Sequence, residues 1–163
     1  MSKTVTVGIA DLNVVKAPDI LVTYALGSCV GICLYDARMK VAGLSHIMLP
    51  SSKQMSNVCA SQPMKFADTG IAMLVQKMER AGARRVNMTA KIAGGAQMFA
   101  AMSTTAIANI GERNVIAVKA MLNQLHIPIV AEDCGKNYGR TQYFSASDGV
   151  MLIKSVTRGQ WTY

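Results

Sequence analysis

The chain has 163 residues, of which 51% are hydrophobic and 16% charged, so residues 1–163 fit one domain with a buried core, and intrinsic disorder is excluded. Its uncharged runs are interrupted by Gly, Ser, Thr, Asn and Gln, which argues against membrane insertion. The net charge of +8 favours an acidic partner, but scattered basic residues and an aromatic content of 6% argue against a nucleic-acid surface.

Strands account for most of the predicted secondary structure. Apolar runs rich in β-branched residues predict eight strands, at residues 4–9, 20–23, 30–35, 41–48, 85–92, 127–132, 141–144 and 150–156. The polar segment at residues 51–57 is predicted to be a loop.

A hydrophobic stripe predicts the first helix. Ile71, Leu74, Val75 and Met78 have the spacing of residues that share one helix face. Gly82 follows as the expected stop. This segment is therefore interpreted as an amphipathic helix.

A second helix is predicted over residues 112–125. Asn109 and Glu112 have the spacing of a capping box, and Pro128 lies just beyond the expected end. The segment 98–108 is open to interpretation as a loop, a short helix or both. Many strands with a few long helices predict an α/β (α+β) fold in which sheet and helix form layers.

The cysteines have neither disulfide-scaffold nor metal-site spacing. There is no Cys-x-x-Cys among the four, which are Cys29, Cys33, Cys59 and Cys134. The segment before Asp11 lacks the apolar core of a signal peptide. We therefore expect a cytoplasmic protein with free thiols and no metal.

The segment most informative about chemistry is the turn at residues 23–31, which leads into an apolar strand. Gly27 and Ser28 leave room around the sulfur of Cys29. A nucleophilic thiol needs an approachable sulfur and nearby backbone donors for the oxyanion, and a tight turn supplies both. The alternative is that Cys29 is a small buried hydrophobic residue.

The chain has two histidines, His46 and His126, and each is a candidate for the base that activates the thiol. His126 follows the second predicted helix, where stabilising the helix dipole explains it. His46 ends an apolar run before the polar loop and is the better candidate for a base. A thiolate–imidazolium pair between Cys29 and His46 would multiply the reactive fraction of the thiol.

Five short blocks carry a resemblance to a known family. In order, they are Gly27-Ser28-Cys29, His46-x-Met48-Leu49-Pro50, Ala90-Lys91-Ile92-x-Gly94-Gly95-Ala96, Ile110-Gly111-x-Arg113-Asn114, and Asp133-x-Gly135 followed by Gly139-Arg140. With these blocks the chain resembles the CheD family of chemoreceptor glutamine deamidases. The resemblance implies a cytoplasmic cysteine hydrolase, without a cofactor, that converts receptor glutamines to glutamates and releases ammonia. It also implies a layered α/β sandwich shared with a deamidating bacterial toxin.

The resemblance assigns roles to individual residues. It implies that Cys29 is the nucleophile, that His46 is the general base, and that Thr23 orients the imidazole. Gly27 and Ser28 would then surround the substrate and the oxyanion. The alternative for Thr23 is an ordinary strand residue.

One position departs from the family pattern. Lys136 stands where family members commonly have a second glycine. Gly135 and Gly139 are then expected to supply the positive φ angles of this loop.

The resemblance also implies partners. The cytoplasmic helices of methyl-accepting chemotaxis receptors would present the glutamine, and a CheC-type phosphatase is a second expected partner. Glutamyl methylesterase activity is consistent with the same chemistry. Two alternatives remain: a non-enzymatic adaptor that binds phosphatase and receptors, and a thiol hydrolase of small amides.

Overall fold

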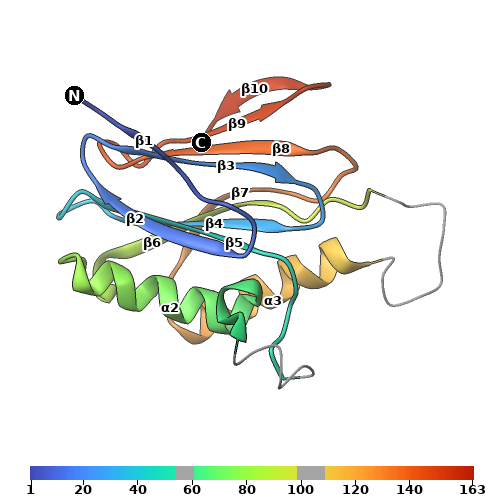
Figure 1. Ribbon diagram of the computed structural model, residues 1–163, viewed down its shortest axis with the longest axis horizontal. Coiled ribbons are helices and arrows are strands. Elements are labelled where there is room, and N and C mark those ends of the chain that lie inside the picture. Colours follow the sequence, from blue (N-terminus) through green and yellow to red (C-terminus); the bar gives the residue numbers. More distant parts are fainter. Residues whose placement is uncertain (54–60, 99–108) are drawn as a thin grey trace.

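In the part of the chain that the structure describes, two β-sheets and two α-helices form three layers (Figure 1). The computed structural model describes residues 1–53, 61–98 and 109–163. One sheet, here called the central sheet, lies between the two helices and the second sheet, here called the outer sheet. This arrangement confirms the predicted layered α/β fold.

The outer sheet has the strand order β1-β3-β8-β9-β10. Its strands are β1 (Thr4–Thr6), β3 (Ile20–Leu26), β8 (Arg140–Ser145), β9 (Met151–Ser155) and β10 (Gly159–Thr162). The pair of β1 and β3 is parallel, and the other neighbouring pairs are antiparallel.

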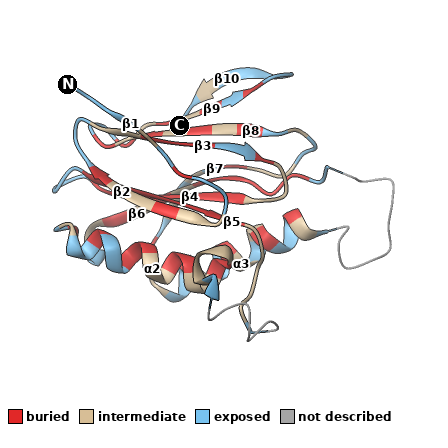
Figure 2. Ribbon diagram, viewed as in Figure 1, coloured by how far each residue is buried: buried red, intermediate tan, exposed pale blue. Residues whose placement is uncertain are grey.

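The central sheet has the strand order β2-β5-β4-β6-β7. Its strands are β2 (Asp11–Lys16), β5 (Val41–Ile47), β4 (Val30–Asp36), β6 (Met88–Gly94) and β7 (Ile129–Cys134). The pair of β6 and β7 is parallel, and the others are antiparallel. Every residue of β4 and β5 is buried (Figure 2), because the helices cover one face of the sheet and the outer sheet covers the other.

The helices pack their predicted apolar stripes on the central sheet. Helix α2 (Ala67–Arg80) buries the four stripe residues of the first prediction and is followed by Gly82 at φ 103°. Helix α3 (Ile110–Gln124) buries Val118 and Leu122. Asn109 occupies the predicted N-cap position, but its side chain makes no capping hydrogen bond. Neither described helix is both long and apolar enough to cross a membrane.

The sequence patterns miss two strands and misplace the start of another. Strands β2 and β10 lie at sheet edges and carry polar residues, so neither reads as an apolar run. The predicted strand at residues 85–92 starts instead at Met88, because Arg85–Asn87 forms a short 3-10 helix. A second 3-10 helix, Pro63–Lys65, precedes α2. Most of the predicted loop at 51–57, the ambiguous segment after Met98, and Cys59 lie outside the described residues.

Candidate active site

The turn that carries Cys29 begins with a bulge at the end of β3. Three steps along β3, from Thr23 to Leu26, match two along β8, from Gln142 to Arg140. Ala25 lies within this bulge at φ 60°, in the left-handed region that non-glycine residues seldom adopt. The extra residue bends the chain out of the outer sheet and into the turn before β4.

Backbone contacts with β6 hold this turn. Gly95 donates a hydrogen bond to the carbonyl of Cys29, and Ala96 donates one to the carbonyl of Gly27, both at 2.8 Å. A Cβ on Gly94 would overlap the Cys29 carbonyl oxygen. The two glycines therefore serve close backbone packing beneath the turn, because a side chain at Gly94 would push the Cys29 backbone away.

The structure brings Thr23 and His46 into direct contact. Both side chains are fully buried, with Thr23 on β3 and His46 on β5. Thr23 Oγ1 lies 2.7 Å from His46 Nδ1, and it also donates a hydrogen bond to the carbonyl of Val7 at 2.7 Å. A hydroxyl has one hydrogen, so Nδ1 must donate to Thr23 and Nε2 carries the free lone pair.

Cys29 lies on the same side of the central sheet as His46. In the pairing of β4 with β5, Gly31 stands opposite His46, and Cys29 comes two residues before Gly31. Diagonal neighbours in antiparallel strands have Cα atoms about 7–8 Å apart, within reach of two side chains. Cys29 packs against the apolar layer between the two sheets, and His46 Nε2 has no hydrogen-bond partner among the described residues. Strand alternation thus places Cys29 and His46 on one side of the sheet, and no hydrogen bond joins their side chains.

Burial controls the ionisation of both groups. It raises the pKa of the half-buried Cys29 thiol above its usual value, although the backbone N–H of Cys29 acts in the opposite direction. Burial lowers the pKa of His46 to about 4. Both shifts favour neutral groups at neutral pH. Both directions act against the expected thiolate–imidazolium pair in the resting protein.

The other described cysteines are placed differently. Cys33 is fully buried on β4, and burial raises its pKa well above the usual value. The pKa of Cys134, at the end of β7, is raised to about 12, chiefly by burial. Neither residue has an environment that activates a thiol.

Asn114 is a site residue for which the sequence supplied no role. It is fully buried on α3, and its Nδ2 donates to the carbonyl of Ser28 at 2.9 Å and to that of Met48 at 3.0 Å. One carboxamide therefore ties the residue before Cys29 to the segment that follows His46. Asn114 belongs to one of the five family blocks, but its contacts join residues distant in sequence, so the pattern alone could not reveal them.

Gln142 fills the space beside Gly31. Its Nε2 donates to the carbonyl of Gly31 at 3.2 Å, and a side chain on Gly31 would overlap its Oε1. Gln142 also stands opposite Thr23 in the outer sheet. Position 31 must therefore lack a side chain for the two sheets to approach at the site.

The remaining sequence expectations have mixed outcomes. His126 is exposed and follows the end of α3, as predicted. Gly135 has φ 82°, as expected, but Gly139 does not adopt a positive φ, so that expectation is wrong. Lys136 itself has φ 63° and takes the conformation that a glycine adopts easily.

Within residues 1–53, 61–98 and 109–163, no three His, Cys, Asp or Glu side chains gather as a metal site.

The layered fold and these side chains define a class: an α/β protein whose candidate active site consists of Thr23, His46 and Cys29. A family model described as "CheD chemotactic sensory transduction" matches residues 48–155. Three relatives bear the name "Probable chemoreceptor glutamine deamidase CheD". The one from Caldanaerobacter subterraneus subsp. tengcongensis is 54% identical, covering 97% of this chain and 96% of its own. Those from Clostridium botulinum strain Eklund 17B and Clostridium novyi strain NT are each 52% identical, covering 95% of this chain and 94% of theirs.

The chain belongs to the CheD family, which confirms the resemblance drawn from its motifs. The matched range of the family model begins after His46. It therefore identifies the family without testing the roles of Thr23, Cys29 and His46.

Proposed function

We propose that this chain is a chemoreceptor glutamine deamidase in which Cys29 is the nucleophile, His46 the general base and Thr23 the residue that orients the imidazole. The activity is the one that the names of its relatives state for those proteins. The observation that carries the proposal is the contact between Thr23 and His46 Nδ1, which leaves Nε2 as an unpaired base on the face that Cys29 shares.

The first half of the reaction forms a thioester. As the Cys29 sulfur attacks the side-chain amide carbon of glutamine, its proton passes to His46 Nε2. The imidazolium then returns this proton to the amide nitrogen, and the C–N bond breaks to release ammonia. Because both groups start neutral, proton transfer accompanies the attack rather than preceding it.

The second half hydrolyses the thioester. Neutral His46 accepts a proton from water as the oxygen attacks the thioester carbon. The C–S bond then breaks, and the Cys29 sulfur takes the proton back from the imidazolium. The net change is glutamine plus water to glutamate plus ammonia, with the enzyme restored.

Backbone donors stabilise the oxyanion in this proposal. The N–H of Cys29 interacts with its own sulfur, so it lies beside the carbon under attack. The N–H of Gly27 is already bonded to the carbonyl of Ala25 at 3.0 Å. Gly27 therefore contributes space rather than a donor, since a Cβ there would contact Met98 at 3.4 Å. The carbonyl of Ser28 accepts a hydrogen bond from Asn114 Nδ2, which stabilises the conformation of the turn.

The decisive experiment uses a cytoplasmic fragment of a chemoreceptor. Mass spectrometry should detect a gain of about 1 Da for each glutamine converted by the wild-type protein. Cys29→Ala should lower the rate by about three orders of magnitude or more. Cys134→Ala, a matched removal of a thiol outside the site, should retain activity. Turnover by purified Cys29→Ala protein at the wild-type rate would reject the nucleophile.

The family resemblance supports further proposals about setting and partners. We place the protein in the cytoplasm, where receptor helices present their glutamines. A CheC-type phosphatase is a proposed partner, and it should slow alkylation of Cys29 if it covers the site. Hydrolysis of a glutamyl methyl ester is a proposed second reaction, because the thiol would attack the ester carbonyl in the same way.

A further inference from the structure

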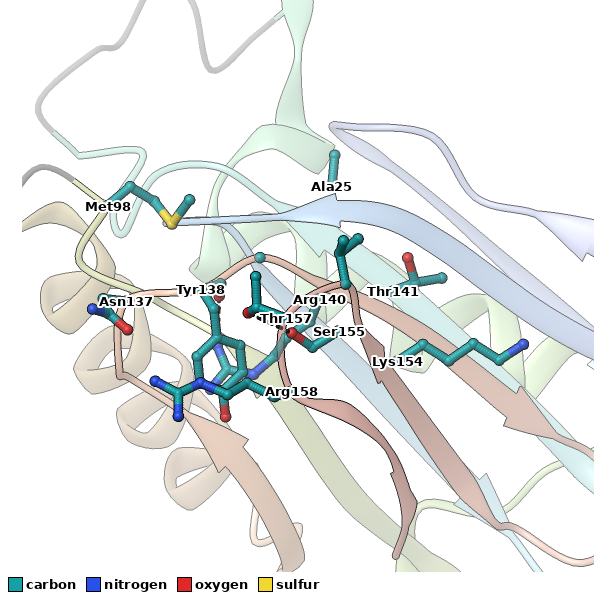
Figure 3. Close-up of a pocket in the computed structure, with 12 residues that line it drawn as sticks. Ala25, Met98, Asn137, Tyr138, Arg140, Thr141, Lys154, Ser155, Thr157 and Arg158 are labelled. Carbon is teal, nitrogen blue, oxygen red and sulfur yellow. Dashed lines mark hydrogen bonds between the residues drawn. The ribbon is translucent and has the colours of Figure 1, made fainter.

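A cleft of about 720 Å³ begins beside the turn that carries Cys29 (Figure 3). Ala25 and Met98 form the side next to this turn, and Tyr138, Lys154 and Arg158 line other parts of the cleft. Met98 is also the residue that a Cβ on Gly27 would contact. A molecule bound in the cleft would therefore lie next to the residues that precede the nucleophile.

The cleft is cationic. Arg140, Lys154 and Arg158 are among its lining residues, and none of those residues is acidic. Arg140 is buried and pairs with Asp133 at 2.9 Å, so its charge is compensated. Lys154 and Arg158 are exposed, and neither forms an ion pair within the described part of the chain. Lys154 and Arg158 therefore give the cleft two positive charges that no acidic side chain neutralises.

Aromatic rings hold these two cations in place. The Lys154 ammonium lies 4.9 Å from the ring centre of Tyr143, and the Arg158 guanidinium lies 5.5 Å from that of Tyr138. A ring attracts a cation without neutralising its charge. The side chains are therefore positioned while remaining able to bind an anion.

Tyr138, which lines the cleft, is held in place by neighbouring side chains. The Arg140 guanidinium lies 4.4 Å from the centre of its ring, and the ring of Trp161 meets it edge-on with centres 6.4 Å apart. Asp133 fixes this group, since it accepts hydrogen bonds from Arg140, Trp161 and Tyr163. Arg140 is 2% exposed, and its Nη2 has no hydrogen-bond partner in the part of the chain that the structure describes. Tyr138 and Arg140 are thus held in fixed positions where they line the cleft.

We propose that this cleft binds acidic side chains of the receptor segment that flanks the target glutamine. This inference rests on the proposed function, because it identifies the part of the substrate that the protein recognises outside the reacting amide. The cleft adjoins the Cys29 turn, so a bound carboxylate and the reacting carboxamide belong to one continuous segment. Lys154 and Arg158 then determine affinity and take no part in bond breaking.

The test removes both charges and compares a matched variant. Lys154→Gln/Arg158→Gln should raise the KM for a receptor fragment about tenfold at low ionic strength and leave kcat within about twofold. It should also weaken the dependence of KM on salt. The control is Lys16→Gln/Arg80→Gln, which removes two exposed charges outside the cleft and should behave like the wild type. Equal KM values for the two double variants would overturn the proposal.

A binding measurement separates this proposal from the proposed function. Cys29→Ala protein, with and without the two cleft substitutions, is titrated with a labelled receptor fragment. A second fragment has the acidic residues beside the glutamine replaced by their amides. The acidic fragment should bind about tenfold more tightly, and only while Lys154 and Arg158 are present. Equal affinity for both fragments would reject the proposal that the cleft binds acidic side chains, whether or not the wild-type protein deamidates the fragments. Absence of deamidation by the wild type would reject the function and leave this binding result to decide the cleft.

Discussion

Thr23 Oγ1 lies 2.7 Å from His46 Nδ1, and the same hydroxyl donates to the carbonyl of Val7. The carbonyl takes the one hydroxyl hydrogen, so the imidazole must supply the hydrogen of the second contact. This arrangement fixes the tautomer of His46 with its lone pair on Nε2. In the proposed mechanism a neutral hydroxyl thus takes the orienting task that a carboxylate performs in many hydrolases, without placing a charge in the apolar layer.

Replacing Thr23 by valine should test that role. Thr23→Val keeps the shape of the side chain but removes the acceptor, so Nδ1 is left unpaired and the tautomer is no longer fixed. We expect kcat to fall about 100-fold, measured as ammonia release from a receptor fragment. Thr23→Ser retains a hydroxyl and should restore most of the rate. Full activity in Thr23→Val would show that the contact has no orienting role.

The neutral state of the resting thiol predicts a characteristic alkylation profile. Because burial raises the pKa of Cys29, its thiolate fraction should rise about tenfold per pH unit between pH 7 and 9. The rate of iodoacetamide labelling, followed on the peptide containing Cys29, should increase with the same slope. A rate that is flat from pH 6 to 8 would instead indicate a preformed ion pair with His46.

The buried imidazole also predicts how stability depends on pH. The pKa of His46 is about 4 in the folded protein, against an ordinary value of 6.5. Between these values the unfolded chain binds the additional proton, so the free energy of unfolding falls as pH decreases from about 6.5 towards 4. The contribution of this residue is at most about 3 kcal/mol.

Urea unfolding of His46→Gln isolates this contribution, because both proteins share the titration of their carboxylates. The variant should lose less stability than the wild type across the window from pH 6.5 to 4. His126→Gln, which replaces an exposed histidine, should retain the wild-type dependence. Identical pH profiles for wild type and His46→Gln would contradict the lowered pKa.

Asn114 should act as a positioning residue. Asn114→Asp preserves its shape but removes the two donors that hold the carbonyls of Ser28 and Met48. We expect kcat to fall at least tenfold with little change in KM, because the segments carrying Cys29 and His46 are no longer tied together. Asn123→Asp, at an exposed position of α3, is the matched control. A proportional loss in both variants would assign the effect to the helix rather than to these hydrogen bonds.

The sequence patterns are most informative where burial is continuous. Strands β4 and β5 are covered on both faces, so most of their residues are apolar and both strands were predicted closely. Strands β2 and β10 lie at sheet edges with polar residues facing solvent, and pairing with their neighbours determines their conformation. The local amino-acid composition therefore does not predict that these segments are strands.

The same distinction applies to the candidate site. Cys29, His46 and Thr23 were named from their local setting and from family motifs. The contacts of Asn114 join residues 86 and 66 positions apart, and no spacing rule predicts them. The ion pair was expected from the ordinary pKa values of a thiol and an imidazole, and burial shifts both values against it. The depth at which a tertiary fold buries these groups is what shifts those values.

The contact between Thr23 and His46 joins the outer sheet to the central sheet across the apolar layer. If Thr23 orients His46 as proposed, the spacing of the two sheets determines the alignment of the site together with the turn. Leu44 and Phe144 are buried in that layer and help to set the distance between the sheets. Replacing either side chain by a smaller one should therefore change the distance between Thr23 and His46, although neither residue belongs to the site.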